Sequence, residues 1–194
     1  MQKGGGKAKG NNFEIEVAQW LSWWITENHE RRRNDLMCRT VLSGGQHTVM
    51  STREKLVGNP GDLQANHELA FPFCRKYVIE CKCWEYLYMI DFLAKKGDLY
   101  DALLKVMEEA HLNNRFWILI ARQNRKPMVA LFATPPDLSI LALMDYHLLF
   151  NGTICMVNFM QLMDAVRVET FIDMYSSMEE EMDENLDEAH QANL

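Results

Sequence analysis

Three features are scarce in this sequence. Its 194 residues include five cysteines, an odd number without the paired spacing of a zinc or disulfide framework. No apolar run is long enough to cross a membrane, because polar residues interrupt the runs near 138–150 and 153–163. Residues 168–194 contain no lysine or arginine. We therefore expect a soluble, cytosolic protein with reduced thiols and no membrane partner.

The negative charge is concentrated at the C-terminal end. The chain has a net charge of −7, but residues 168–194 hold nine of the 27 acidic residues, and residues 1–167 carry 20 basic against 18 acidic residues. The body is therefore mildly basic, with a net charge of +2. The acidic end is either a solvated tail that aids solubility or a mimic of DNA that covers a basic surface. We favour the solvated tail.

Length and composition predict one domain with flexible ends. A hydrophobic content of 48% over 194 residues suffices for one core. Residues 1–12 are rich in glycine and lysine and predict a flexible basic arm. Residues 178–194 are too acidic to pack, and we expect them to be disordered or loosely helical. Lys7 and Lys9 in the arm and Arg32 after the first helix are candidate phosphate contacts, with a solvated chain end as the alternative.

Hydrophobic periodicity predicts an alternating order of helices and strands. Phe13, Val17, Trp20, Leu21 and Trp24 recur at helical spacing, which indicates an amphipathic helix. Trp20, Trp23 and Trp24 could stack on bases, but aromatic residues at helical spacing favour core packing. We expect Trp23 to be the exception among the three. The expected helices are 13–27, 99–112 with Asp98 as N-cap, 137–149 and 160–175, and the expected strands are 36–42, 61–69, 76–83, 115–121, 128–132 and 153–157.

Two carboxylates and one amine form the main candidate site. If residues 61–69 and 76–83 pair as an antiparallel hairpin around residue 71, Asp62 lies opposite Glu80. The two-residue period of a strand puts Lys82 on the same face as Glu80. Two carboxylates can bind Mg²⁺ beside a substrate phosphate, and an adjacent amine can orient water or offset negative charge. The alternative is a surface hairpin with one cross-strand ion pair.

A zinc site is a weaker alternative on the same segment. His67, Cys74, Cys81 and Cys83 are close in sequence. However, Cys81 and Cys83 alternate away from Glu80 towards the core, and no CxxC spacing occurs.

Several segments, in order, resemble the PD-(D/E)XK nuclease superfamily, and specifically its phage and archaeal Holliday-junction-resolvase-like members. The matching segments are residues 9–14, Arg39 with Ser43-Gly44-Gly45, residues 59–63, Phe71-Pro72-Phe73 before Ile79-Glu80-Cys81-Lys82, and residues 122–127. The resemblance spans roughly residues 7–133. A glutamine or tryptophan that phage relatives often carry in the second helix has no clear match between Leu99 and Leu112.

The resemblance implies a restriction-endonuclease-like α/β core over residues 13–133. This core has a helix, a three-stranded antiparallel meander, a helix and two further strands in a mixed sheet, and residues 134–177 form a C-terminal α/β extension of the same domain. The implied activity is a Mg²⁺-dependent DNA endonuclease, in which Mn²⁺ substitutes for Mg²⁺. The implied location is the cytoplasm, that of the host if a phage encodes the chain.

The resemblance also assigns roles to residues. Asp62 and Glu80 bind the metal, with the Cys81 carbonyl and Glu14 as further ligands, and Lys82 serves the attacking water. The implied DNA contacts are Lys7, Lys9, Arg39, Ser43, Arg32 and Arg125.

The preferred substrate and assembly state follow from the kind of nuclease. We expect a homodimer that cuts branched DNA, because two symmetric sites can then lie across a branch point. A restriction-like or nicking enzyme on ordinary duplex is the alternative. A non-catalytic DNA-binding or assembly protein on a nuclease fold is a further one, although the presence of Asp62, Glu80 and Lys82 together argues against it.

Overall fold

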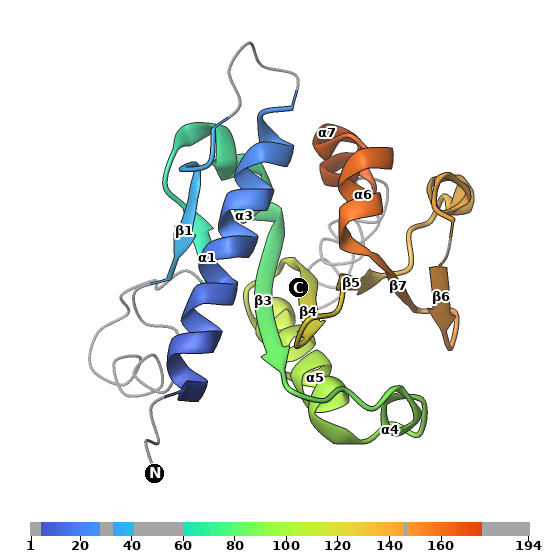
Figure 1. Cartoon of the computed structure of the whole chain (residues 1–194). Helices are drawn as coiled ribbons and strands as arrows, with labels where there is room; N and C mark the ends of the chain where they lie inside the picture. Colours follow the sequence, from blue (N-terminus) through green and yellow to red (C-terminus); the bar gives the residue numbers. More distant parts are fainter. Residues whose placement is uncertain (1–4, 28–32, 41–59, 146, 176–194) are drawn as a thin grey trace, which may run out of the picture.

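A computed structural model describes residues 5–27, 33–40, 60–145 and 147–175 of the chain (Figure 1). Its centre is a mixed five-stranded sheet in the order β3-β4-β5-β7-β6. β3 (Tyr77–Trp84) runs parallel to β4 (Phe116–Gln123), and β5 (Met128–Ala133), β7 (Ile154–Asn158) and β6 (His147–Phe150) follow in antiparallel pairs. β3 forms one edge of this sheet.

Helices cover both faces of the sheet. α1 (Gly5–Ile25), α6 (Phe159–Ala165) and α7 (Val168–Asp173) lie on one face, and α4 (Met89–Leu93) and α5 (Gly97–Leu112) lie on the other (Figure 1). Successive strand residues point to opposite faces, so each face has its own core. The core under α1 includes Ile79, Ile118, Ile120 and Phe132, and the core under α5 includes Val78, Leu119 and Leu131.

A small second sheet lies beside the edge strand. β1 (Met37–Arg39) and β2 (Leu63–Ala65) pair antiparallel, and the 3₁₀ helix η1 (Glu68–Ala70) and helix α3 (Phe71–Lys76) lead on to β3. The predicted three-stranded antiparallel meander is therefore wrong in one pairing: the third strand forms as β3, but it does not pair antiparallel with β2. Pro72 in the first turn of α3 explains this difference, because proline there favours a helix.

Several predicted boundaries also differ. α1 begins at Gly5, eight residues before Phe13, and Lys96, not Asp98, is the N-cap of α5. The predicted helix 137–149 is wrong: a 3₁₀ helix η2 (Leu138–Leu143) and β6 occupy this segment. Asn151 and Gly152 both have positive φ and close the β6–β7 hairpin, a turn signal that Asn-Gly carries in sequence.

The C-terminal helix is split in two. Between α6 and α7 the backbone at Val166 is extended, so residues 160–175 do not form one continuous helix. The Asn158 side chain accepts hydrogen bonds from the Met160 and Gln161 backbone N–H groups and so starts α6.

The predicted mixed α/β fold is confirmed. The strands predicted at 76–83, 115–121, 128–132 and 153–157 all form with small shifts at their ends. The five cysteines are free. Within the described ranges, no helix is both long enough and apolar enough to span a membrane.

Candidate active site

The edge strand β3 sorts its side chains into two rows. Ile79 and Cys81 are buried in the core under α1, whereas Val78 is buried in the core under α5. Because the period of a strand is two, Glu80 and Lys82 lie in the same row as Val78. This row places a carboxylate that is only 1% exposed, and an amine, beside α5.

Asp62 reaches this row through a close approach of its backbone to β3. Gly61 forms a parallel bridge with Ile79, and the Asp62 N–H donates a hydrogen bond of 2.7 Å to the Ile79 carbonyl. Gly61 has φ +83°, and a Cβ at this position would lie 2.5 Å from the Ile79 oxygen. Only glycine fits there without strain. Asp62 and Glu80 are thus neighbours, as the sequence predicts, but on parallel segments and not across an antiparallel hairpin.

The Lys82 amine lies where three oxygen atoms converge. Its Nζ is 3.2 Å from Asp62 Oδ2, 2.5 Å from Glu80 Oε1 and 3.3 Å from the Cys81 carbonyl oxygen. Asp62 Oδ2 also accepts a hydrogen bond of 2.9 Å from the Cys81 N–H. Both carboxylates, the Cys81 carbonyl and Lys82 were predicted to lie together, and the structure brings them together.

Burial and mutual charge shift the ionisation of this group. Burial, followed by the nearby charge of Glu80, raises the pKa of Asp62 to about 6, and Lys82 and the Cys81 N–H only partly oppose this shift. Burial on its own would lower the pKa of Lys82, but the carboxylates of Asp62 and Glu80 outweigh it and raise that pKa. Lys82 is therefore a protonated ammonium at neutral pH. The site holds two buried acids that one further cation would stabilise.

Helix α5 supplies two site residues that sequence reasoning missed. Lys105 Nζ contacts Glu80 Oε1 at 3.0 Å, so two lysines share one carboxylate oxygen. Glu109, one turn further along α5, accepts a hydrogen bond of 2.9 Å from the Gly61 N–H. Both residues lie beside the buried stripe of α5. Their spacing of four residues on the helix flank is the only sequence signal that could have marked them, and it is common on solvated helices.

Glu14 and Arg39 form an ion pair at the α1 side of the site. Arg39 Nε donates to Glu14 Oε2, and Arg39 Nη2 donates to Asn11 Oδ1 at 2.9 Å. The Glu14 side chain is 12% exposed, and its charge contributes to the raised pKa of Asp62. Glu14 therefore lies near the carboxylates but is held by Arg39.

A second α1 carboxylate is also paired. Arg122, at the end of β4, donates two hydrogen bonds to Glu16, of 2.7 and 2.8 Å, and its guanidinium lies 4.6 Å from the centre of the Phe13 ring. This pair ties α1 to the central sheet.

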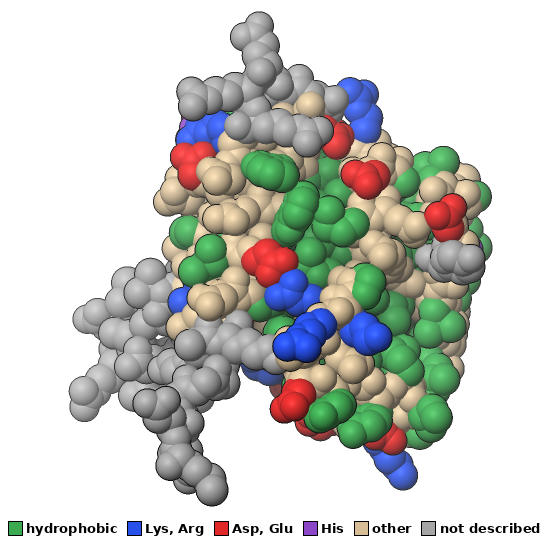
Figure 2. All heavy atoms as spheres, viewed as in Figure 1, with side chains coloured by type: hydrophobic (Ala, Val, Ile, Leu, Met, Phe, Trp, Pro, Cys, Tyr) green, Lys and Arg blue, Asp and Glu red, His purple; other side chains and the backbone are tan. Residues whose placement is uncertain are grey.

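The remaining predicted DNA contacts lie in different places. Lys7 and Lys9 belong to the first turns of α1, where the structure describes the backbone only. Arg32 and Ser43 lie outside the described residues, as does the acidic segment 178–194. Arg125 is exposed in the β4–β5 turn with φ +61°. Figure 2 shows that lysine and arginine side chains gather over this part of the sheet on the face that α1 covers.

The residues of the zinc hypothesis make separate contacts. His67 Nδ1 accepts a hydrogen bond from the Leu69 N–H, the Cys74 thiol contacts Met37, and Cys81 is buried in the core. Burial raises the pKa of the Cys81 thiol well above its usual range, so this side chain stays protonated. The described part of the chain brings no three His, Cys, Asp or Glu side chains into a metal-binding group.

The oxygen atoms around Lys82 nevertheless suit a hard divalent cation. Mg²⁺ keeps several water ligands and is commonly held by one or two carboxylates together with substrate phosphate, so it does not require three protein carboxylates. Asp62, Glu80 and the Cys81 carbonyl provide oxygen ligands only, and a positively charged group already occupies their point of convergence. The residues present therefore fit such an ion.

Comparison with known proteins agrees with this geometry. Residues 5–182 match the model of a protein family described as "Phage putative PDDEXK endonuclease". No curated protein and no solved structure matches the chain significantly. The family match covers most of the chain, including Asp62, Glu80, Lys82 and α5. The chain therefore belongs to this family of phage PD-(D/E)XK endonucleases and is a nuclease.

Proposed function

We propose that the chain is a Mg²⁺-dependent endonuclease that hydrolyses phosphodiester bonds of DNA, with a preference for branched DNA. The convergence of Asp62 Oδ2, Glu80 Oε1 and the Cys81 carbonyl on one cationic position is the observation that carries the metal dependence. The membership of a phage endonuclease family supports the nuclease activity.

Asp62, Glu80 and the Cys81 carbonyl would hold the Mg²⁺. When bound, Mg²⁺ supplies positive charge that stabilises the phosphoryl oxygens as negative charge develops on them. Glu14 is a proposed accessory ligand, which requires that its carboxylate exchange the Arg39 guanidinium for the new partner. Burial of the two main carboxylates strengthens their attraction for any cation, because little solvent screens them.

Lys82 is proposed as a hydrogen-bond donor. In the metal-free site its amine is protonated, because Asp62 and Glu80 raise its pKa, and an ammonium group donates hydrogen bonds but accepts none. With Asp62 and Glu80 holding the metal, the partly exposed Lys82 ammonium would give up its contacts with these carboxylates and would donate to the attacking water or to the phosphate, which offsets the charge of the transition state.

Lys105 and Glu109 act on the site from α5. The Lys105 amine balances the charge of Glu80 in the metal-free site and so competes with a cation for this carboxylate, whereas the Glu109 carboxylate holds the Gly61 N–H so that Asp62 stays against β3. Arg39 and Arg125 are the proposed phosphate contacts among the described side chains. A homodimer would present two such sites across a branch point.

The test compares DNA shapes under one set of conditions. Labelled four-way junction, flap and linear duplex of matched sequence are incubated with the protein in Mg²⁺ or in EDTA, with Asp62→Ala as the inactive control. Faster cutting of the junction supports the branched-DNA preference. Equal cutting of all three substrates, or faster cutting of linear duplex, would contradict it, and cutting in EDTA would contradict the metal dependence.

A further inference from the structure

The segment that follows the catalytic strand exposes two aromatic rings. Tyr86 and Tyr88 lie between β3 and α4, and they are 61% and 66% exposed. Their rings are nearly parallel, with 21° between the ring planes and 6.4 Å between the centroids. Large rings left in water at adjacent positions offer an apolar surface that a ligand can cover.

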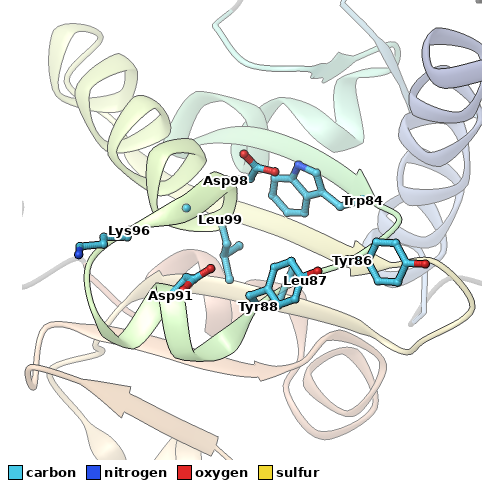
Figure 3. Close-up of a pocket in the computed structure, with 9 residues that line it drawn as sticks. Trp84, Tyr86, Leu87, Tyr88, Asp91, Lys96, Asp98 and Leu99 are labelled. Atoms are coloured by element: carbon cyan, nitrogen blue, oxygen red, sulfur yellow. The ribbon is translucent and has the colours of Figure 1, made fainter.

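A cavity of about 190 Å³ lies beside these rings (Figure 3). It is smaller than the pockets of roughly 300–1,000 Å³ that hold drug-sized ligands, so it suits one small planar group. In Figure 3 the Lys96 amine points away from the cluster. Trp84, Tyr88, Asp91, Lys96, Asp98 and Leu99 are among the lining residues.

The cavity continues the row of catalytic side chains. Trp84 follows Glu80 and Lys82 at the period of two, and it packs against the core under α5, on the face where Glu80 contacts Lys105. At roughly 3.3 Å per residue along β3, Trp84 lies about 7 Å beyond Lys82. The cavity therefore begins close to the proposed catalytic residues.

Charge around the cavity favours a base and not a phosphate. The Asp91 and Asp98 carboxylates repel phosphate, but they can accept hydrogen bonds from the amino groups of bases. Phosphate contacts are available next to the cavity. The Asn124 N–H donates a hydrogen bond of 2.7 Å to the Trp84 carbonyl, which holds the turn with exposed Arg125 and Lys126 beside this segment.

We propose that the pocket formed by Trp84, Tyr86, Tyr88 and Leu99 binds an unpaired base of the DNA substrate close to the cut. Bases inside a duplex keep their faces stacked on one another, so only an unpaired base can present a face to the tyrosine rings. The inference rests on the proposed action on DNA, and it gives that site a means of selecting branched or frayed substrates.

The binding experiment uses the full chain in EDTA, so that no cutting occurs. Two labelled DNAs share one duplex, and one of them carries six extra unpaired nucleotides, in separate versions for each strand polarity. The test variant is Tyr86→Ala/Tyr88→Ala, and the matched control is Ile90→Ala, because Ile90 is 81% exposed in the same region and does not line the cavity.

The expected result is a selective loss. Alanine substitution of a base-stacking aromatic costs roughly 5- to 150-fold in affinity, so the double variant should bind the tailed DNA at least about 10-fold more weakly. Its affinity for blunt duplex should stay within about twofold, and Ile90→Ala should change neither. A 2-aminopurine base in the tail should lose fluorescence on binding the wild type, through stacking, and keep it with the variant.

Two results would overturn the proposal: unchanged affinity of the double variant for tailed DNA of both polarities, or an equal loss of affinity for both DNAs. Melting curves check that the variant folds, which is expected because both tyrosines are exposed. A parallel cutting assay in Mg²⁺ separates this inference from the proposed function. Cutting by the wild type with unchanged tail binding by the variant refutes the pocket alone. Selective loss of tail binding in a protein that cuts no DNA supports the pocket and refutes the proposed catalysis.

Discussion

Replacing Asp62 with asparagine should make the metal-free protein more stable while removing its activity. The Asp62 carboxylate is 7% exposed and lies beside Glu80, and these surroundings raise its pKa from 3.8 to about 6. The folded state therefore disfavours the charged carboxylate relative to the unfolded state. Asparagine has nearly the same shape and can still accept the hydrogen bond from the Cys81 N–H, but it carries no charge.

The size of the effect follows from linkage. A shift of about two pKa units corresponds to roughly 3 kcal/mol at pH values above the folded pKa. The asparagine amide also costs some free energy to bury, so we expect a gain of about 1–3 kcal/mol, or roughly 2–10 °C in melting temperature for a domain of this size. Below pH 3.8 the carboxylate is protonated in both states, and the gain should vanish. It should grow between pH 4 and 6 and stay level above that.

The assay is thermal or urea unfolding of both proteins in EDTA across pH 4 to 8. Asp101→Asn, at an exposed position of α5, is the matched control and should show no gain. Added Mg²⁺ should stabilise the wild type, by about 2.7 kcal/mol at 100 times its Kd, and should have little effect on Asp62→Asn. If the asparagine variant is less stable than the wild type at pH 8 in EDTA, or if its gain does not depend on pH, the electrostatic reasoning is wrong.

Three further substitutions test separate parts of the site. Lys82→Ala should reduce cutting about 10²- to 10⁴-fold while DNA affinity changes little, because its amine acts in the transition state; a parallel loss of affinity would make it a phosphate contact instead. Lys105→Ala should lower the Mg²⁺ concentration needed for half-maximal cutting several-fold, because it removes a cation that competes at Glu80; a higher Mg²⁺ requirement would contradict this role. Gly61→Ala should destabilise the fold by about 1–3 kcal/mol and abolish cutting, since its Cβ would clash with the Ile79 carbonyl; unfolding and cutting curves equal to the wild type would refute the need for glycine.

The site was predictable from sequence where local chemistry determines it. The two-residue period of β3 places Glu80 and Lys82 in one row whatever the strand pairs with, and the apolar residues around them identify a buried strand. Asp62 was predicted from a pairing that does not occur. Its position depends on the small volume of Gly61 and on the path of α3, which brings β3 back parallel to the Gly61–Asp62 segment. Both the predicted and the observed pairing bring the two carboxylates together.

The sequence by itself determined the mixed α/β class, the buried stripe of α5 and the row of side chains on β3, because these follow from residue periodicity along single segments. Tertiary structure alone decided which charged residues of α5 meet that row, since Lys105 and Glu109 differ from their solvated neighbours only in what packs opposite them. It also decided that Arg39 pairs with Glu14 and that Tyr86 and Tyr88 remain in water beside a cavity. Contacts between segments far apart in the chain depend on how the layers pack, and no local pattern encodes that packing.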